Sequence, residues 1–232
     1  MTTSLKLYSH ESANMSIQAP NAEALRPSMK SQRLNELKNA CALLADGLSG
    51  FDDLIEKYVR VEKRNRRDTP SRDCERFLEW IETEVHLTDQ QRDMIVNQQS
   101  RHAVEFVALK QRIAHLRYEE ILSNSQPFNK QSAQHLGQFV HMNPVHVWAT
   151  FDTHTFIEDE SPIPATVLFY PASGSVQTAV IDKQSEQIIR ELEQGPQKLR
   201  TLLKQTPKEE RETFLEAIQR LVSLKILALA SS

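Results

Sequence analysis

The sequence has 232 residues, of which 39% are hydrophobic and 25% are charged, so it fits one or two ordinary globular domains. A net charge of −3 argues against a protein that wraps nucleic acid, because that binding needs a surplus of Lys and Arg. No apolar stretch approaches the roughly 18 residues of a membrane span, and the first twenty residues lack the apolar core of a secretory signal. We therefore expect a cytoplasmic protein without a membrane partner, in which residues 1–30 form a mobile or loosely docked tail.

Residues 31–125 have the pattern of a helical bundle. Ser31 can cap a first helix, a second follows it, and Thr69-Pro70 opens a third. The capping-box pattern Thr88-Asp89-Gln90-Gln91 opens the longest helix, which we expect to run unbroken to about Leu122. The apolar face predicted for this helix consists of Ile95, His102, Phe106, Leu109, Ile113 and Leu116.

Residues 126–232 change to strand-like patterns. Two sets of side chains alternate with a period of two over 147–151, 165–170 and 176–181, which predicts a first strand or extended arm, then a half-buried strand and the strand that returns from it. Ser173-Gly174 predicts a tight turn between the last two.

Three short helices are expected to follow these strands. Asp182 is a cap for the first of them, and Gly195-Pro196 ends it. Thr206-Pro207-Lys208-Glu209 predicts a capping box at the start of the last. The predicted fold class is therefore α+β, with an N-terminal helical bundle (31–125) and a C-terminal winged-helix-like domain (126–232) that holds a small antiparallel sheet and three helices.

The sequence offers no concentration of catalytic side chains. His102 and Glu105 reverse the order of the Glu-x-x-His unit of di-iron bundles, and no second copy exists. Cys41 and Cys74 lie on apolar helix faces, where reduced, inert thiols are the usual interpretation. One hypothesis is an autonomous metalloenzyme that uses four histidines: His135, His141, His146 and His154. These histidines lack the tight spacing of zinc ligands. We expect no catalytic residue, metal site or cofactor in this chain.

The predicted hairpin offers an interaction surface instead. Unpaired backbone groups along an edge strand can template an extended peptide as an additional strand. The candidate peptide-binding residues on the strand are Val176, Gln177, Thr178, Ala179, Val180 and Ile181. Phe214, Leu215 and Ile218 of the last helix are candidates for lining the peptide's side-chain pockets, with the domain's own core as the alternative for Phe214 and Ile218. Proline at Gln177 or Ala179 is expected to remove a donor from the edge.

A winged-helix DNA-binding regulator is the alternative function. The basic stretch RVEKRNRR, residues 60–67, could contact phosphates, but it contains no aromatic side chain for stacking on bases. The last helix is rich in glutamate, and an acidic recognition helix would repel the phosphate backbone. A solvated surface or a protein contact is therefore favoured over nucleic acid.

Two segments resemble known families. The stretch from ATVLFYPASGSVQTAVID through KQSEQIIRELEQGP to the helix FLEAIQRLVSLKILAL is similar to PqqD-like winged-helix domains, which bind the leader peptide of a ribosomally made precursor as an extra strand. The segments CERFLEWIETEV and VALKQRIAHLRYEEI resemble the helical half of the small partner proteins of TIM-barrel multinuclear-iron oxidases. The resemblance covers about residues 70–230 and is closest in layout to the partner subunits of methanobactin biosynthesis.

The resemblance implies a mechanism divided between chains. An iron-bearing oxidase partner would convert a cysteine of a short precursor peptide into an oxazolone–thioamide group with dioxygen. This chain would dock on that partner and hold the leader peptide. The iron is expected in the partner, and the chain is not expected to be an enzyme by itself.

Overall fold

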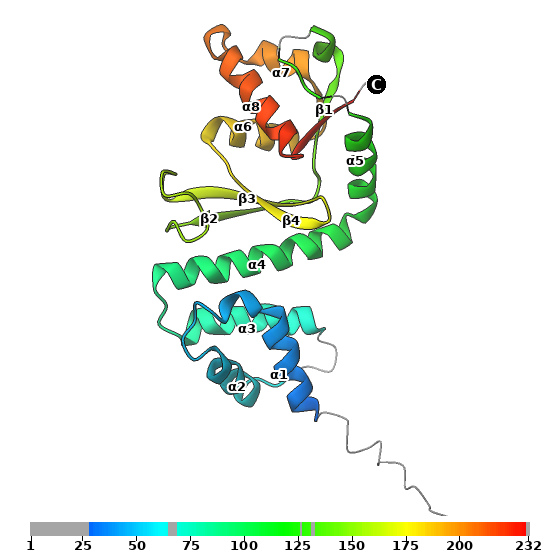
Figure 1. Cartoon of the computed structure of the whole chain (residues 1–232). Helices are drawn as coiled ribbons and strands as arrows, with labels where there is room; N and C mark the ends of the chain where they lie inside the picture. Colours follow the sequence, from blue (N-terminus) through cyan, green and yellow to red (C-terminus); the bar gives the residue numbers. More distant parts are fainter. Residues whose placement is uncertain (1–27, 65–68, 126, 131–132, 231–232) are drawn as a thin grey trace, which may run out of the picture.

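The computed structural model describes residues 28–64, 69–125, 127–130 and 133–230 (Figure 1). The predicted tail lies outside them except for residues 28–30. The described α-helices are α1 (Met29–Ala40), α2 (Phe51–Val61), α3 (Pro70–Glu84), α4 (Asp89–Lys110), α5 (Arg112–Asn124), α6 (Lys183–Leu192), α7 (Leu199–Gln205) and α8 (Arg211–Ser223). The strands are β1 (Phe139–Met142), β2 (Val147–Phe151), β3 (Ala165–Ala172), β4 (Ser175–Val180), β5 (Gln197–Lys198) and β6 (Leu227–Ala230). The α+β class is confirmed.

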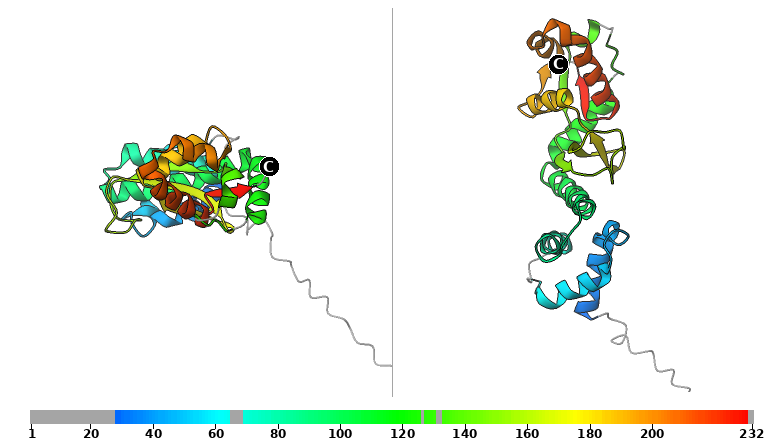
Figure 2. Two further views of the ribbon diagram at one scale, coloured as in Figure 1. Left: turned by 90° about the horizontal axis from the view of Figure 1, so that it is seen from above. Right: turned by 90° about the vertical axis from the view of Figure 1, so that its left-hand side faces the viewer.

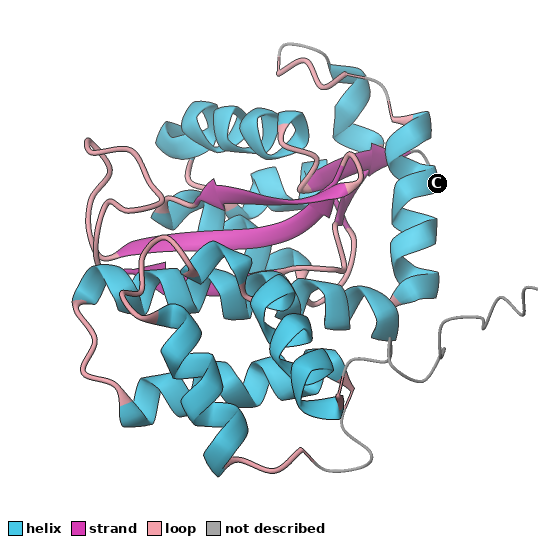
Figure 3. Cartoon of the chain, turned by 60° about the horizontal axis from the view of Figure 1, so that its bottom comes forward, coloured by secondary structure: helices cyan, strands magenta, loops and turns pink. Residues whose placement is uncertain are grey.

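The elements stack in layers along an elongated molecule (Figure 2). Helices α1, α2 and α3 lie at one end, and α6, α7 and α8 lie at the other. Between them, α4 runs across one face of the sheet formed by β2, β3 and β4, and Figure 3 shows helices on both faces of this sheet. A second small sheet, in the order β5–β1–β6, packs between α5 and the C-terminal helices.

The helix starts follow local capping signals, with one shift. Ser28 caps α1 by accepting from the Ser31 N–H, so the predicted cap at Ser31 is wrong by one turn. Thr69 caps α3, the helix expected after Thr69-Pro70, by accepting from the Arg72 N–H. The capping box of α4 is confirmed, since the Thr88 hydroxyl accepts from the Gln91 N–H at 3.3 Å and the Gln91 side chain accepts from the Thr88 N–H at 3.0 Å.

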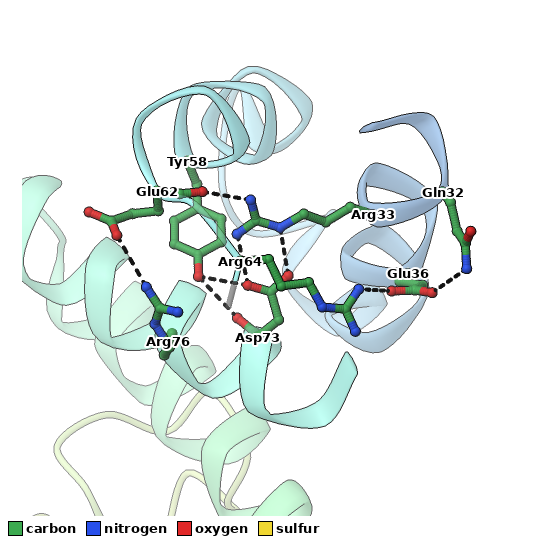
Figure 4. Close-up of polar contacts among 8 residues, drawn as sticks. All are labelled: Gln32, Arg33, Glu36, Tyr58, Glu62, Arg64, Asp73 and Arg76. Atoms are coloured by element: carbon green, nitrogen blue, oxygen red, sulfur yellow. Dashed lines mark hydrogen bonds and ion pairs between the residues drawn. The ribbon is translucent and has the colours of Figure 1, made fainter. Parts of the chain in front are cut away.

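A buried ion pair joins α1 to α3 (Figure 4). The Arg33 guanidinium donates to the two carboxylate oxygens of Asp73 at 2.7 and 2.8 Å and to the Glu62 carbonyl at 2.6 Å. The Tyr58 hydroxyl donates to Asp73 Oδ1 at 3.0 Å. Burial by itself would raise the pKa of Asp73, but the hydrogen bonds and charge of Arg33, with the Tyr58 hydroxyl, hold that pKa below its usual range. All three guanidinium nitrogens therefore have partners, as a buried pair requires.

Helix α4 is covered on two opposite sides, which explains why buried polar residues interrupt its apolar pattern. Toward the sheet, Asp93 accepts from the N–H groups of Asp152 and Thr153 at 3.1 and 2.8 Å and from the Thr153 hydroxyl at 2.6 Å. Toward α1, the Gln98 amide donates to the Ala40 carbonyl at 2.9 Å. Helix α4 thus anchors the sheet on one side and α1 on the other.

The predicted single helix from Thr88 to Leu122 is wrong, because the chain turns at Gln111 and continues as α5 (Figure 1). Helix α5 packs on β6, where the Tyr118 hydroxyl donates to the Lys225 carbonyl at 2.9 Å. Of the predicted buried face, Ile95 is buried, but four residues near the turn are exposed: Phe106, Leu109, Ile113 and Leu116. The division at residue 125 stays a prediction, and α4 and α5 of the first part contact the strands of the second.

Strand β3 is the centre of its sheet and is buried on both faces, where half-burial was predicted. Leu168 and Tyr170 pack with the C-terminal helices, whereas Val167 and Phe169 pack with Val104 of α4. The second face is buried because α4 covers it. The turn predicted at Ser173-Gly174 is confirmed: both residues have positive φ, 54° and 82°, as a two-residue hairpin of this twist requires.

The C-terminal helices begin and end partly as predicted. Asp182 caps α6 by accepting from the Ser185 N–H at 2.7 Å. The capping box at Thr206 is wrong, since that hydroxyl donates to the Leu202 carbonyl at 2.9 Å and a 3₁₀ turn, Lys208–Glu210, precedes α8.

The last helix ends at Ser223, and β6 replaces its predicted continuation. Lys225 adopts φ 61°, and its N–H donates to the Val222 carbonyl at 2.9 Å. The Ile226 N–H donates to the Leu221 carbonyl at 3.0 Å, which completes a Schellman motif without glycine. No helix in the described ranges combines the length and the apolar composition needed to cross a membrane.

Candidate peptide-binding edge

Strand β4 lies at the edge of its sheet, and no strand among the described residues pairs with its outer side. The Ile181 N–H donates to the Thr166 carbonyl of β3 at 2.8 Å. Since backbone groups alternate along an antiparallel ladder, Gln177 and Ala179 also direct their N–H groups to β3. The outward row therefore belongs to Val176, Thr178 and Val180.

This alternation corrects the expected effect of proline. Gln177 and Ala179 were expected to donate along the free edge, but their N–H groups belong to the β3–β4 hairpin itself. Proline at either position would therefore break the hairpin and leave the outer edge unchanged. A substitution that tests the edge has to be made at Thr178 or Val180.

One end of the outward row already has a partner. The Arg101 guanidinium of α4 donates from Nη1 to the Val176 carbonyl at 3.3 Å and from Nε to the Asn97 side chain at 3.2 Å. Thr178 is exposed, and Val180 is 42% exposed. These two residues form the accessible part of the edge.

A surface hollow of about 640 Å³ adjoins Thr178 and Val180. One wall comes from the loop after β2, with Phe156 and Ile157, and another from Leu224, directly after α8. The hollow combines an accessible strand edge with apolar side chains on both sides of it. Such a combination can bind an extended segment through its backbone and take up alternate side chains.

The three candidates on α8 do not line this hollow. Phe214 is 6% exposed and Ile218 is 0% exposed, and both lie in the core between α6, α8 and the sheets. Leu215 is half-buried against the same core. Of the strand candidates, Ala179 and Ile181 are buried on the side of the C-terminal helices, and Ala179 also borders the hollow.

Three residues that line the hollow were not among the candidates: Phe156, Ile157 and Leu224. Nothing in the sequence around them indicates that they lie close to β4.

A second exposed surface lies where α4 turns into α5. Leu109 is 76% exposed and Ile113 is 70% exposed, and Phe106 and Leu116 are also at least half exposed. We call these four residues the apolar patch. Leu109, Ile113 and Leu116 also line a shallow hollow. The charged side chains around this hollow are all basic: Lys110, Arg112 and Arg117. Exposed apolar side chains gathered in this way are typical of protein interaction sites.

The four histidines near the start of the C-terminal part lie apart. Three of them bond to separate partners: His135 to Gln138, His146 to Glu193 and His154 to Ser161. Burial lowers the pKa of His141, which lies in β1. In the part of the chain that the structure describes, no three His, Cys, Asp or Glu side chains gather as ligands for a metal ion.

The charged segments that could have contacted nucleic acid make contacts within the chain. In the basic stretch, Arg64 pairs with Glu36 of α1 at 2.6 Å, and residues 65–67 lie outside the described ranges. On α8, Glu216 and Glu212 lie 2.7 and 3.7 Å from Lys130.

No family model matches this chain, and no curated protein is found to match it. The functional assignment therefore depends on the geometry of the β4 edge and of the apolar patch, together with the resemblance described above.

Proposed function

We propose that this chain is a non-catalytic subunit of a heteromeric peptide-modifying iron oxidase. It binds the leader of a short, cysteine-containing precursor peptide as an extra strand beside β4. A TIM-barrel partner with a multinuclear iron site oxidises the precursor's cysteine to an oxazolone–thioamide group, as in methanobactin-type biosynthesis. The subunit acts in the cytoplasm and contributes binding and positioning to the reaction.

The accessible strand edge beside an apolar hollow supports this proposal more than any other observation. Added main-chain hydrogen bonds at Thr178 and Val180 would supply affinity, and Phe156, Ile157 and Leu224 would contact the side chains of the peptide. Holding the substrate in this way reduces the entropy lost when the reacting cysteine meets the partner's iron site. The order β3–β4–α6–β5–α7–α8 supports the PqqD-like winged-helix assignment, which is part of the same proposal.

Thr178→Pro tests the strand addition. A peptide selected from a random-peptide display library against the full chain serves as the probe. The substitution is expected to weaken binding of this peptide about tenfold or more, because it removes an outward N–H and places a ring in the path of the added strand. The hairpin is expected to remain, since the Thr178 N–H makes no bond to β3. Isothermal calorimetry measures the affinity.

Thr178→Val is the matched control, because it keeps the backbone N–H and is expected to keep the affinity. Amide exchange followed by NMR gives a second readout. On peptide binding, the amides of Thr178 and Val180 should gain protection, whereas those of Gln177 and Ala179 are already protected by the hairpin. A folded Thr178→Pro variant with unchanged affinity, or protection gained on another surface alone, contradicts strand addition at β4.

The apolar patch is proposed as the docking surface for the oxidase partner. Its exposed apolar side chains and the basic residues beside it fit a partner surface that is apolar at its centre and acidic at its rim. Leu109→Glu combined with Ile113→Glu is expected to weaken the complex at least tenfold while leaving the fold intact, since both side chains are mostly exposed. Analytical size exclusion of the mixed subunits measures complex formation.

Val61→Glu is the control for this pair of substitutions. Val61 ends α2 and is 55% exposed, so the substitution adds one negative charge, where the patch variant adds two, at an exposed apolar site away from the patch. It is expected to leave the complex intact. Equal complex formation by the patch variant and the control contradicts the assignment of the patch.

A further inference from the structure

Cys41 and Cys74 meet in the core of the N-terminal helices, although they lie 33 positions apart in the sequence. Cys41 follows α1 as its C-cap, and Cys74 lies in α3. Their Sγ atoms are 2.7 Å apart, which is closer than an ordinary non-bonded contact between sulfur atoms. A disulfide bond is about 2.05 Å long, so only a small approach separates this pair from bonding.

His102 of α4 lies beside the pair. Its Nε2 is 3.9 Å from Cys74 Sγ, 3.1 Å from the Ala40 carbonyl oxygen and 2.6 Å from the Gln98 side-chain nitrogen. The imidazole can therefore take up the Cys74 proton or stabilise the thiolate.

The two thiols are electrostatically unequal. The hydrogen bond with Cys41 lowers the pKa of Cys74, burial opposes this effect, and His102 lowers that pKa further. The same contact with Cys74, together with burial, raises the pKa of Cys41. Cys74 is therefore the nucleophilic member of the pair, because the thiolate is the reactive form of cysteine.

Solvent reaches the histidine beside the pair, but neither sulfur atom. A surface hollow of about 390 Å³ is lined by His102, Gln98 and Ala40, and also by Ala42 and Pro70. Both sulfur atoms are buried behind this wall. An oxidant as small as hydrogen peroxide fits the hollow and meets His102 there, and it reaches the Cys74 sulfur when this wall opens locally.

We propose that Cys41 and Cys74 form a reversible disulfide, a redox-sensitive modification site that joins the end of α1 to α3. The Cys74 thiolate attacks one oxygen of a peroxide, the O–O bond breaks, and Cys74 becomes a sulfenic acid while hydroxide leaves. The Cys41 sulfur then attacks the Cys74 sulfur, the S–O bond breaks, and a second hydroxide leaves. Each hydroxide takes up one thiol proton, so two thiols and one peroxide yield one disulfide and two waters.

The disulfide would stabilise the packing of the N-terminal helices. It closes a loop, residues 41–74, that contains α2 and Asp73, the partner of Arg33, and it restricts the unfolded chain more than the folded one. In a reducing cytoplasm the pair stays as thiols until peroxide rises, which is the behaviour of a redox-sensing pair. This inference is independent of the β4 edge and of the partner.

The experiment exposes the reduced full-length chain to stoichiometric hydrogen peroxide. Mass spectrometry is expected to show the loss of two hydrogen atoms and a linked peptide pair that contains Cys41 and Cys74. Dithiothreitol is expected to restore both thiols. The thermal unfolding midpoint of the oxidised chain is expected to rise by several degrees.

Three variants separate the roles of the residues. Cys41→Ala is expected to leave a sulfenic acid at Cys74 that dimedone traps, whereas Cys74→Ala is expected to give no trapped product at Cys41. His102→Gln is expected to slow disulfide formation severalfold while circular dichroism shows an unchanged helix content. Two free thiols after oxidation of the folded wild-type chain, or a sulfenic acid on Cys41 in place of Cys74, would overturn the proposal.

Discussion

Replacing Asp73 by alanine is expected to lower the free energy of unfolding of the N-terminal helices by about 3–5 kcal/mol, because the Arg33 charge would remain buried without its partner. The Tyr58 hydroxyl would lose its acceptor at the same time. Urea unfolding followed by the fluorescence of Trp80, which lies in the same helix, α3, measures the loss.

Two controls separate the buried pair from a general effect of charge. The double variant Arg33→Met with Asp73→Leu is expected to recover most of the stability, since an apolar pair of similar volume avoids the buried charge. Glu36→Gln removes the partner of Arg64 in a more exposed ion pair and is expected to cost at most about 1 kcal/mol. If Asp73→Ala and Glu36→Gln lowered the free energy of unfolding by similar amounts, the large effect expected at Asp73 could not come from burial of its ion pair.

The same pair predicts a dependence on pH. The folded-state pKa of Asp73 is held below its usual range, so the folded state binds its proton less readily than the unfolded chain does. The stabilisation is fully present above the ordinary pKa of about 4 and is lost as the pH falls toward the lower folded value. Asp73→Asn should therefore flatten the acid side of the stability curve of the N-terminal helices.

Replacing Asp93 by alanine is expected to cost about 3 kcal/mol and to loosen the segment that follows β2. The carboxylate accepts from two N–H groups and one hydroxyl of Asp152 and Thr153, and its loss leaves these donors without their partner in a half-buried place. That segment continues into Phe156 and Ile157, which line the hollow beside β4. The affinity for the selected peptide should therefore fall together with stability.

Amide exchange distinguishes this effect from global unfolding. The amides of Asp152 and Thr153 should lose protection in Asp93→Ala, while those in the centre of β3 keep it. Asp93→Asn keeps one accepting oxygen and is expected to lose about half as much stability. Unchanged exchange at Asp152 and Thr153 would show that Asp93 does not anchor the sheet to α4.

Elements with a strong local signal are where sequence predicts them. The Thr88 capping box, the Asp182 cap and the turn at Ser173-Gly174 depend on residues close together in the chain, and the structure has all three. The start of α1 moves by one turn because Ser28 and Ser31 are equally able to cap.

Elements without such a signal were missed. After α8, Lys225 adopts a left-handed conformation in which glycine is the usual residue. Because no glycine marks the end of the helix, the sequence predicts a helix that continues through the residues of β6. Strand β5 has two residues and β1 has four, which is too short for an alternating pattern to identify them. Their pairing with each other and with β6 is made by residues far apart in the chain.

In the candidate site, too, local sequence patterns predicted the elements but not how they pack. Alternation over residues 176–181 identified the strand, but it could not tell which N–H groups face β3, because that depends on the register of the hairpin. Apolar spacing marked Leu109 and Ile113 as members of one face, and only the packing of α4 and α5 on the sheets shows that this face is exposed.

The sequence alone determined the α+β class, most of the helices and the β3–β4 hairpin, since these follow from the spacing of apolar residues and from caps and turns a few residues long. Tertiary structure decided the free edge at Thr178 and Val180, the exposed patch at the turn of α4 into α5, and the meeting of Cys41 with Cys74. Each of these depends on which surfaces of distant segments cover one another, and local spacing does not encode that choice.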